Sequence, residues 1–553
     1  MSDEMTFLGI DLGTTYSVVT YIDETGRPSV IRNVITNTET TPSVVYFEEE
    51  SGEVIVGEAA RNVARVYPHR VVERVKRSMG SEVQWDFDGH SHSAEAISAL
   101  ILKRLAEDAR DYIGREVKQV VITVPAYFGM LERDATRNAG RIAGLDVIGI
   151  VPEPVAAALQ YEMHRGDQPR TVLVYDLGGG TFDTTVIRIS ADLIEVLCTD
   201  GDQELGGVDW DRRLADHLLT EFIARAEPDG DPAGDEQFLS ELQQTAEELK
   251  RHLSQATTRK VPIRFGGSVA NVEVSRETFE DITRDYLDRT IEYTERTLGK
   301  LAAKLTIDDP AAAIDEVLLV GGSSKMPAVR ARLTARWPGW QPKLHDPDLA
   351  VAKGAARYAF SRSLWDWERS GAAAPTPEEQ NARITHLAQR SGVDEDALRE
   401  MAAKKIVNVL PKSFGVMLTD PTVTPYRHYV EHLVHADEAL PSGERVLNAR
   451  TIEDGQTSVS IEIYEQAGAT ESPDLDANKA VDHGSGEIGG LPPLKAGSPV
   501  DITMVVDDEG LLRLHAVEPS TGKELDIEVR VSILSEAQVN EAKEVVAGIT
   551  VRS

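Results

Sequence analysis

Three short apolar runs in the first two thirds of the chain have the pattern of buried β-strands. Residues 120–124, 172–175 and 317–320 are rich in β-branched side chains and are bounded by glycine, proline or aspartate. Between these runs, apolar residues recur every three or four positions over residues 94–112 and 279–301, which predicts amphipathic helices. Buried strands that alternate with helices are typical of a sheet covered by helices, so we expect an α/β fold up to about residue 360.

A helix start is encoded further along the chain. Thr376 and Glu379 have the spacing of a capping box, and Pro377 occupies the first helical position. Gly392 would end this helix, and a second short helix fits behind it. The pattern predicts a small helical hairpin over residues 376–404.

From about residue 405 onward, apolar and polar residues alternate instead. Residues 459–463 and 500–506 both show this period of two, and turn-forming sequences separate such runs. The pattern predicts a half-buried antiparallel sheet, and its short strands favour a β-sandwich. Ser535 and Gln538 then stand in capping-box spacing, with room for one short helix behind them.

Composition narrows the class of protein. A chain of 553 residues and 60.5 kDa is long enough for about three to five domains. The 92 acidic against 58 basic side chains give a net charge of −34, which would repel phosphate backbones, so we expect no nucleic-acid binding. The first residues lack the pattern of a signal peptide, and no apolar run reaches membrane-spanning length. We expect a cytoplasmic protein without a membrane partner.

The single cysteine, Cys198, lies in an apolar stretch and excludes an internal disulfide framework. It also excludes a metal site built from several thiolates. A buried, unreactive side chain is therefore expected at this position.

One motif occurs twice in the α/β part of the chain. Residues 8–19 (LGIDLGTTYSVV) and residues 174–183 (VYDLGGGTFD) each predict a strand that ends in Asp-Leu-Gly, a turn of small residues and a returning strand. Successive backbone N–H groups in such a turn bind anions, and glycine lets a phosphate approach them. Asp11 and Asp176 end the two strands, where each could hold a hydrated Mg²⁺ that bridges phosphates. The candidate phosphate-binding residues are Gly13, Thr14, Thr15, Tyr16, Gly178, Gly179, Gly180 and Thr181.

The alternative is a pair of ordinary hairpins, because Asp-Gly turns are common. Two copies at the starts of two α/β halves argue against that interpretation. The chain has no Gly-x-x-x-x-Gly-Lys-Ser/Thr element, and no Gly-x-Gly-x-x-Gly opens a helix. These absences exclude a P-loop and a Rossmann dinucleotide site.

Together with the two hairpins, four further motifs resemble the 70-kDa heat-shock chaperones of the DnaK type, within the actin-like ATPase superfamily. They are VPAYF at 124–128, EPVAAA at 153–158, LGGVD at 205–209 and VGGSS at 320–324. The resemblance covers residues 1–360 strongly and 405–532 more weakly. It implies a two-lobed actin-like ATPase with ATP or ADP and Mg²⁺ between the lobes, and unfolded or extended polypeptide clients. A J-domain co-chaperone and a nucleotide exchange factor are further partners that it suggests.

The resemblance assigns catalytic roles to five residues. Lys76 matches the lysine that reaches the γ-phosphate, and a positioned cation there would stabilise the charge on the transferred phosphoryl group. Glu153 and Asp176 match residues around the metal and the attacking water. Thr181 and Asp183 match groups that position this water. Without the resemblance, Lys76 would be interpreted as a solvated surface lysine.

A nucleoside site is implied in the same way. Four polar residues spaced by three and four lie on one predicted helix face, which is also typical of a solvated charged surface. They are Glu247, Lys250, Arg251 and Ser254. Further matches in glycine-rich turns are Gly206, Gly207, Gly321, Gly322, Ser323 and Asp348. Lys325 stands where the family usually has an arginine that stacks against the adenine. Lysine lacks the planar stacking surface of the arginine guanidinium group, so we expect weaker nucleotide affinity.

Several features depart from the family. Pro125 and Arg133 match its inter-domain switch, but the linker at 404–411 reads KKIVNVLP instead of an acidic-flanked leucine run. The loop at 420–429 replaces a small-residue loop that usually lines the peptide groove. The chain ends at Ser553, which leaves no room for a helical lid, so bound peptide should leave quickly.

We therefore expect four parts: an ATPase domain at 1–370, a helical hairpin with linker at 371–411, a β-sandwich at 412–532 and a short helix at 533–553. The function that this favours is an ATP-hydrolysing chaperone. The alternative is a nucleotide-gated scaffold for one dedicated partner, in which the hairpin and the altered loop provide the recognition surface. A sugar kinase or filament-forming relative fits less well, because the β-rich region after residue 405 has no place in it.

Overall fold

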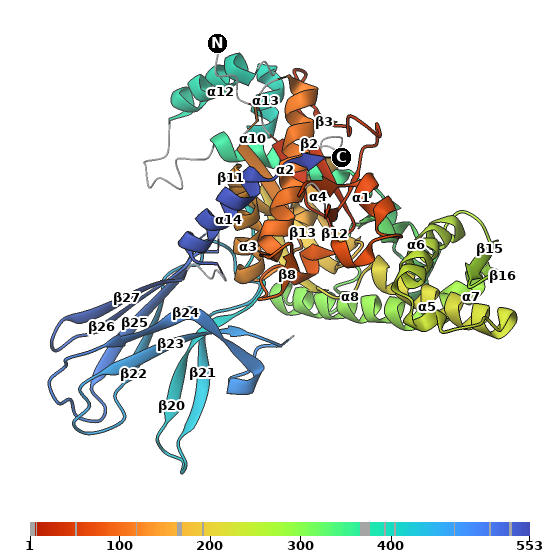
Figure 1. The fold of residues 1–553 in the computed structure, drawn as a ribbon. Coiled ribbons are helices and arrows are strands. Elements are labelled where there is room, and N and C mark those ends of the chain that lie inside the picture. Colours follow the sequence, from red (N-terminus) through yellow and green to blue (C-terminus); the bar gives the residue numbers. More distant parts are fainter. Residues whose placement is uncertain are drawn as a thin grey trace.

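The structure is a computed structural model, and the described residues are 6, 8–49, 52–114, 116–117, 119–162, 169–190, 193–364, 376–391, 394–402, 405–468, 470–507, 510–529 and 534–552. The first part of the chain forms two lobes, each around one six-stranded sheet, and the later part forms a pair of antiparallel sheets (Figure 1). The α/β prediction for residues up to 360 is confirmed. None of the helices in these described ranges is long and apolar enough to cross a membrane.

Lobe I (residues 8–162) has the strand order β11-β10-β1-β2-β3, with β4 paired to β2. Its strands and their small neighbours are β1 (Leu8–Asp11), β2 (Tyr16–Ile22), β3 (Pro28–Val30), β4 (Thr41–Pro42), β5 (Val44–Phe47), β6 (Val54–Val56), β7 (Val71–Glu73), β8 (Gln84–Phe87), β9 (His90–Ser93), β10 (Gln119–Val124) and β11 (Asp146–Pro152). Its helices are α1 (Glu58–Val63), η1 (Pro68–Arg70), η2 (Val75–Ser78), α2 (Ala94–Ile113), α3 (Met130–Ile142) and α4 (Glu153–Glu162). The apolar faces of α2 and α3 pack on the sheet and form the core of this lobe.

Lobe II (residues 169–344) has the strand order β18-β17-β12-β13-β14-β19. Its strands are β12 (Arg170–Leu177), β13 (Phe182–Ile189), β14 (Leu193–Asp202), β15 (Thr258–Phe265), β16 (Ser268–Ser275), β17 (Glu316–Val320), β18 (Lys343–Leu344) and, from the linker, β19 (Lys405–Val407). Its helices are α5 (Gly207–Ala226), η3 (Pro232–Gly234), α6 (Glu236–Leu253), α7 (Arg276–Ile282), α8 (Arg284–Leu305), η4 (Gly322–Lys325) and α9 (Pro327–Arg336). The single helix predicted over 279–301 is therefore wrong, because the chain breaks at Thr283, whose hydroxyl donates to the carbonyl of Phe279.

Two helices lie between the lobes. α4 and α10 (Ala350–Leu364) belong to one buried cluster with apolar side chains from both six-stranded sheets. Because the sheets face each other across this layer, the turns of their first hairpins come together at one end of it. This arrangement positions the candidate site.

The helical hairpin predicted at 376–404 is present as α12 (Pro377–Ser391) and α13 (Glu395–Ala402). The Thr376 hydroxyl accepts from the amide of Glu379, whose carboxylate accepts from the amide of Thr376, as a capping box requires. Leu387 and Leu398 are buried in the cluster around α10. Gly392, the predicted end of the first helix, lies outside the described residues.

Two four-stranded antiparallel sheets, with orders β21-β20-β23-β24 and β22-β25-β26-β27, share one apolar core. Their elements are β20 (Phe414–Asp420), β21 (Arg427–Val434), β22 (Arg445–Arg450), β23 (Val459–Gln466), η5 (Leu475–Ala477), β24 (Asn478–Ile488), β25 (Pro499–Val506), β26 (Leu512–Glu518) and β27 (Lys523–Val529). We call residues 412–529 the β-module. It projects from one side of the two lobes (Figure 1).

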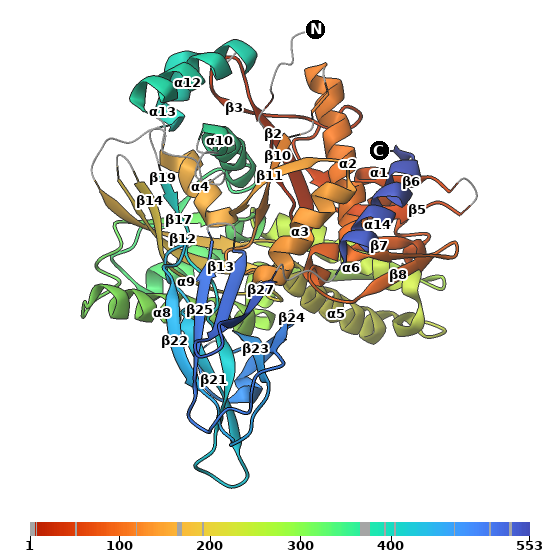
Figure 2. The same ribbon diagram turned by 90° about the vertical axis from the view of Figure 1, so that its left-hand side faces the viewer.

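The end of the described chain leaves the β-module. The predicted helix is α14 (Glu536–Gly548), with a capping box between Ser535 and Gln538. It packs on α2 and α3 of lobe I (Figure 2) and is followed by a strand, β28 (Val551–Arg552), that pairs with β6. The expectation of a helix alone was therefore incomplete.

Candidate functional site

The two repeated hairpins face each other across the lobes. β1 pairs with β2, and β12 pairs with β13, so each Asp-Leu-Gly sequence ends a strand beside a tight turn. A side chain at Gly179 would collide with Thr15, and one at Gly180 would collide with Thr14. Glycine is needed at these two positions because the turns approach each other so closely. The candidate phosphate-binding turns therefore form opposite walls of one narrow site.

Acidic side chains gather beside these turns. Glu153, Asp176 and Asp183 are buried, and Asp11 lies next to them with partial exposure. Loss of hydration, reinforced by repulsion from Glu153, raises the pKa of Asp11 to about 7 and that of Asp183 to about 8. The pKa of Asp176 is raised for the same two reasons. The raised pKa values mean that these carboxylates are not all ionised at neutral pH unless a cation compensates their charge.

Lys76 supplies part of that compensation. Its side chain is 5% exposed, and its Nζ donates to Oε1 of Glu153 at 2.6 Å. Burial alone would lower the pKa of Lys76, but Glu153 and Asp11 raise it, so the ammonium group stays charged. The ammonium also lies 5.9 Å from the centre of the Phe128 ring. One cation therefore faces four carboxylates.

The donor set suits a hydrated divalent cation. Among the described residues, no three His, Cys, Asp or Glu side chains converge closely enough to hold a metal ion by themselves. Mg²⁺ usually keeps several waters and takes only one or two carboxylates together with phosphate oxygens. The excess of negative charge at Asp11 and Asp176, beside two turns that could hold phosphate, fits that mode of binding.

The loop between β10 and α3 connects the acidic cluster to the β-module. Oδ1 of Asp183 accepts from the amide of Tyr127 at 2.9 Å. Nε of Arg133 donates to the carbonyl of Phe128 at 2.9 Å, and burial lowers the pKa of this arginine to about 10. Met130, three residues after Tyr127, packs into the core of the β-module. The switch position predicted at Arg133 thus stabilises a loop that contacts both Asp183 and the β-module.

The predicted nucleoside residues surround the other end of the cleft. The Tyr16 hydroxyl donates to Glu247 at 3.2 Å and accepts from Arg251 at 3.3 Å. Nζ of Lys250 donates to the carbonyl of Gly207 at 2.9 Å. A side chain at Gly207 would collide with Ser323, so this residue lies in the same wall.

Four further predicted residues lie at neighbouring positions. Lys325 forms an ion pair with Asp348, next to Gly322. Gly321 has φ +80°, and a side chain there would collide with Asp176. This position requires glycine for both reasons.

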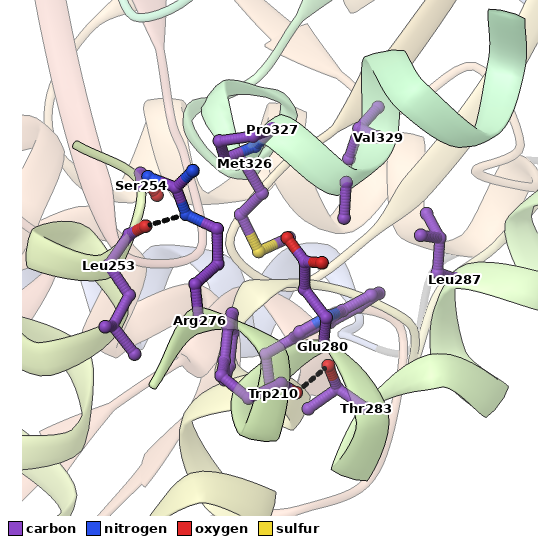
Figure 3. A pocket seen from close by; sticks show the side chains of 12 residues that line it. Trp210, Leu253, Ser254, Arg276, Glu280, Thr283, Leu287, Met326, Pro327 and Val329 are labelled. Carbon is purple, nitrogen blue, oxygen red and sulfur yellow. Dashed lines mark hydrogen bonds between the residues drawn. The ribbon is translucent and has the colours of Figure 1, made fainter. Parts of the chain in front are cut away.

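Ser254 lies at the edge of a small pocket behind the nucleoside residues. The pocket lies between α6, α7 and α9 and has a volume of about 370 Å³, which includes space open to solvent. Figure 3 shows Arg276, Glu280 and Met326 around it, with Arg276 donating to the carbonyl of Leu253 at 2.7 Å. Because Ser254 lines it, the pocket adjoins the residues predicted to bind the nucleoside.

A second pocket of about 460 Å³ spans the cleft itself. Lobe I lines it with Thr14, Thr15, Tyr16 and Arg61, and lobe II with residues that include Asp211, Gln243 and Glu247. Oδ2 of Asp211 accepts from Lys250 at 2.8 Å. Within the described part of the chain, Oδ1 of Asp211 and Nε2 of Gln243 are buried without a hydrogen-bond partner. Two residues that line this pocket thus carry a buried acceptor and a buried donor without a partner.

Sequence reasoning missed four residues of the cleft: Arg61, Arg77, Asp211 and Gln243. Arg61 reaches across it to Glu247 at 2.6 Å. Arg77 donates to the carbonyl of Gly180 at 2.8 Å and pairs with Asp209 at 2.6 Å. No local motif identifies Arg61. Arg77 could have been predicted, because it adjoins Lys76 and its partner Asp209 ends the LGGVD motif.

The family model described as Hsp70 protein matches residues 7–87, 81–360 and 399–547. The chain belongs to the Hsp70 family. It is 35% identical over 534 residues, 95% of its length and 80% of theirs, to the "Chaperone protein DnaK" of Thermotoga petrophila, of Thermotoga sp. (strain RQ2) and of Thermotoga neapolitana. The chain is therefore an ATP-dependent chaperone with a two-lobed, actin-like ATPase. The hairpin α12–α13 lies mostly outside the matched ranges.

Proposed function

We propose that the cleft between the lobes binds Mg²⁺ with ATP or ADP and hydrolyses ATP through the residues assembled around Lys76. The observation that carries this proposal is the single buried ammonium group among four carboxylates, flanked by two glycine turns. Backbone N–H groups and threonine hydroxyls in those turns bind the phosphates. Mg²⁺, when bound, supplies positive charge next to the phosphate oxygens, with Asp11 and Asp176 as its protein ligands.

Hydrolysis then depends on positioning and electrostatics. Lys76, oriented by its hydrogen bond to Glu153, stabilises negative charge on the transferred phosphoryl group. Asp183 and Thr181 orient the attacking water.

The nucleoside occupies the end of the cleft lined by Glu247, Lys250 and Ser254. Lys325 lies beside the base, where its ion pair with Asp348 restrains it. The ribose is the group that would satisfy the unpartnered Oδ1 of Asp211 and Nε2 of Gln243, because a hydroxyl both donates and accepts.

The β-module is a β-sandwich that binds extended segments of unfolded polypeptide. Two four-stranded sheets around one core support this assignment. J-domain co-chaperones and nucleotide exchange factors are the further partners that we propose, and the cytoplasmic location stays a prediction. The domain limits stay at 1–370, 371–411, 412–532 and 533–553, although α14 and β28 of the last segment pack on lobe I.

Nucleotide and polypeptide binding are coupled through contacts between these parts. The linker strand β19 pairs in parallel with β14 of lobe II. Oδ1 of Asp437 in the β-module accepts from the amide of Thr199 in the same lobe at 3.0 Å. Because each ligand favours one arrangement of the lobes, each changes the affinity for the other.

The proposal is tested by titrating the full chain with ATP and with ADP in the presence of Mg²⁺ in a calorimeter. Saturable heat with both nucleotides is expected, and an unfolded polypeptide should then raise steady-state ATP turnover. Absence of any heat would overturn the nucleotide site. Turnover that no unfolded polypeptide stimulates, together with capture of one stoichiometric folded partner, would favour the scaffold function instead.

A further inference from the structure

The segment behind the β-module is built into lobe I. Val539, Val546 and Val551 are buried in the same apolar cluster as the side chains of α2 and β6. Figure 2 shows α14 lying against α2 and α3, while β27, which precedes it, belongs to the β-module. We call residues 534–552 the strap.

Hydrogen bonds from lobe I stabilise both ends of α14. Arg141 of lobe I donates to both carboxylate oxygens of Glu536 at 2.9 and 2.6 Å, at the helix N-terminus. Nζ of Lys103 donates to the carbonyls of Val546 at 2.9 Å and Ile549 at 2.7 Å, at its C-terminus. Carbonyls at the end of a helix lack the amide partners of its interior. Lys103 supplies a donor to the Ile549 carbonyl and adds a second bond to the Val546 carbonyl, which also accepts from the amide of Ile549 at 3.3 Å.

The strap also completes a sheet. β28 adds in parallel to β6, with Val551 opposite Val54, and the amide of Val54 donates to the carbonyl of Thr550 at 3.1 Å. Arg552 pairs with Glu53 at 2.6 Å. The edge of the sheet β6-β5-β7 is therefore covered by the chain itself, and releasing the strap would expose unpaired backbone groups.

The β-module is thus attached at two places. On entry, β19 extends the sheet of lobe II. On exit, the strap extends a sheet of lobe I. Four residues, 530–533, separate β27 from the strap, and they span at most about 18 Å between Val529 and Leu534.

We propose that the strap stays docked on lobe I in every nucleotide state, so that the β-module is held between the two lobes and its exit end moves with lobe I. Three buried valines, a strand pairing and two fastened helix ends all oppose release. Rotation of one lobe against the other then moves the two ends of the β-module relative to each other. The coupling part of this inference rests on the proposed function of the β-module, but the docking part does not.

Hydrogen exchange on the full chain tests the docking directly, without any substitution. With ADP and with ATP, the amides of α14 and of β6 should exchange at least about a thousandfold more slowly than in an unstructured chain, and equally in both states. Fast exchange across residues 536–552 with either nucleotide would overturn the proposal, because the strap would then be a reversible lid.

Adjacent valines provide matched variants for the coupling. Val546 is 1% exposed in the core of lobe I, whereas Val545 is 39% exposed on the same helix. The probe is fluorescein-labelled, reduced and carboxymethylated α-lactalbumin, a permanently unfolded polypeptide. The factor by which ATP accelerates its release should fall at least about tenfold in Val546→Asp and stay unchanged in Val545→Asp.

A second variant tests the coupling in case Val546→Asp does not fold. Inserting ten glycine and serine residues after residue 531 leaves the strap in place but lengthens the segment that joins it to β27. This variant should lose most of the same acceleration. Full acceleration in the lengthened chain would overturn the coupling role. If the unmodified chain does not bind the probe, the proposed peptide site fails, and hydrogen exchange still decides the docking.

Discussion

Replacing Lys76 by alanine separates the roles of the buried ammonium group. The Nζ–Oε1 distance to Glu153 is 2.6 Å, and the side chain is surrounded by carboxylates with little access to water. Removing one positioned charge-stabilising donor typically costs a factor of about 10²–10³ in rate, and a cation that contacts a transferred phosphoryl group contributes about 10³–10⁵. We expect hydrolysis in Lys76→Ala to slow by about three orders of magnitude.

The same substitution also affects folding. Glu153 would lose the cation that pairs with it, and a buried charge left unpaired costs about 3–5 kcal/mol. The nucleotide-free variant should therefore unfold at lower urea concentration. Combining Lys76→Met with Glu153→Gln removes both charges, so this double variant should regain most of the stability without regaining hydrolysis.

Single-turnover hydrolysis with enzyme in excess over ATP measures the chemical step, and calorimetry with Mg²⁺-ADP checks that the nucleotide still binds. Lys260→Ala, on an exposed part of β15, is the matched control and should behave as the unmodified chain. A single-turnover rate within about threefold of the unmodified chain would refute the role of Lys76, since its charge would then not act on the transition state.

Three further outcomes are expected. Arg61→Ala removes the pair across the cleft with Glu247 and should speed dissociation of fluorescent ADP about threefold to tenfold in stopped-flow experiments, and an unchanged rate would contradict this. Burial raises the pKa of Asp211 to about 6, so the folded state holds a proton that the unfolded state loses above about pH 4, and the free energy of unfolding should fall by about 2 kcal/mol as pH rises from 4 to 6. In urea titrations the fall should be smaller by this amount in Asp211→Asn, in which Asp11 and Asp183 still contribute. An equal fall in both proteins would reject the assignment. Ile406→Asp places a charge where β19 packs on lobe II and should increase trypsin cleavage after Lys405 in the presence of ATP, whereas equal cleavage would show that this contact does not hold the linker.

Features that depend on neighbouring residues were predictable from the sequence. The hairpins around Asp11 and Asp176, and the capping boxes at Thr376 and Ser535, are encoded within a few positions by glycines, caps and the period of apolar residues. The candidate phosphate turns followed for the same reason, because an anion-binding turn is a local backbone property.

Features that depend on packing between distant segments were not predictable in this way. Arg61 and Glu247 are 186 positions apart, and nothing near Arg61 marks it as part of a cleft. The strand β28 has only two residues and exists because β6 offers an unpaired edge. The break between α7 and α8 at Thr283 interrupts an apolar period that by itself predicts one continuous helix.

The repeated hairpin also shows how one local pattern provides two different functions. In lobe I, Asp11 lies opposite Val18 in the β-ladder, so this hairpin presents one carboxylate beside its turn. In lobe II, Asp176 lies opposite Asp183, so the second hairpin presents two. The additional carboxylate is the one that accepts from the amide of Tyr127, in the loop that leads to the β-module. In the function proposed above, a change of charge at Asp183, beside the attacking water, therefore acts directly on that loop, whereas a change at Asp11 does so only through the metal and the phosphates.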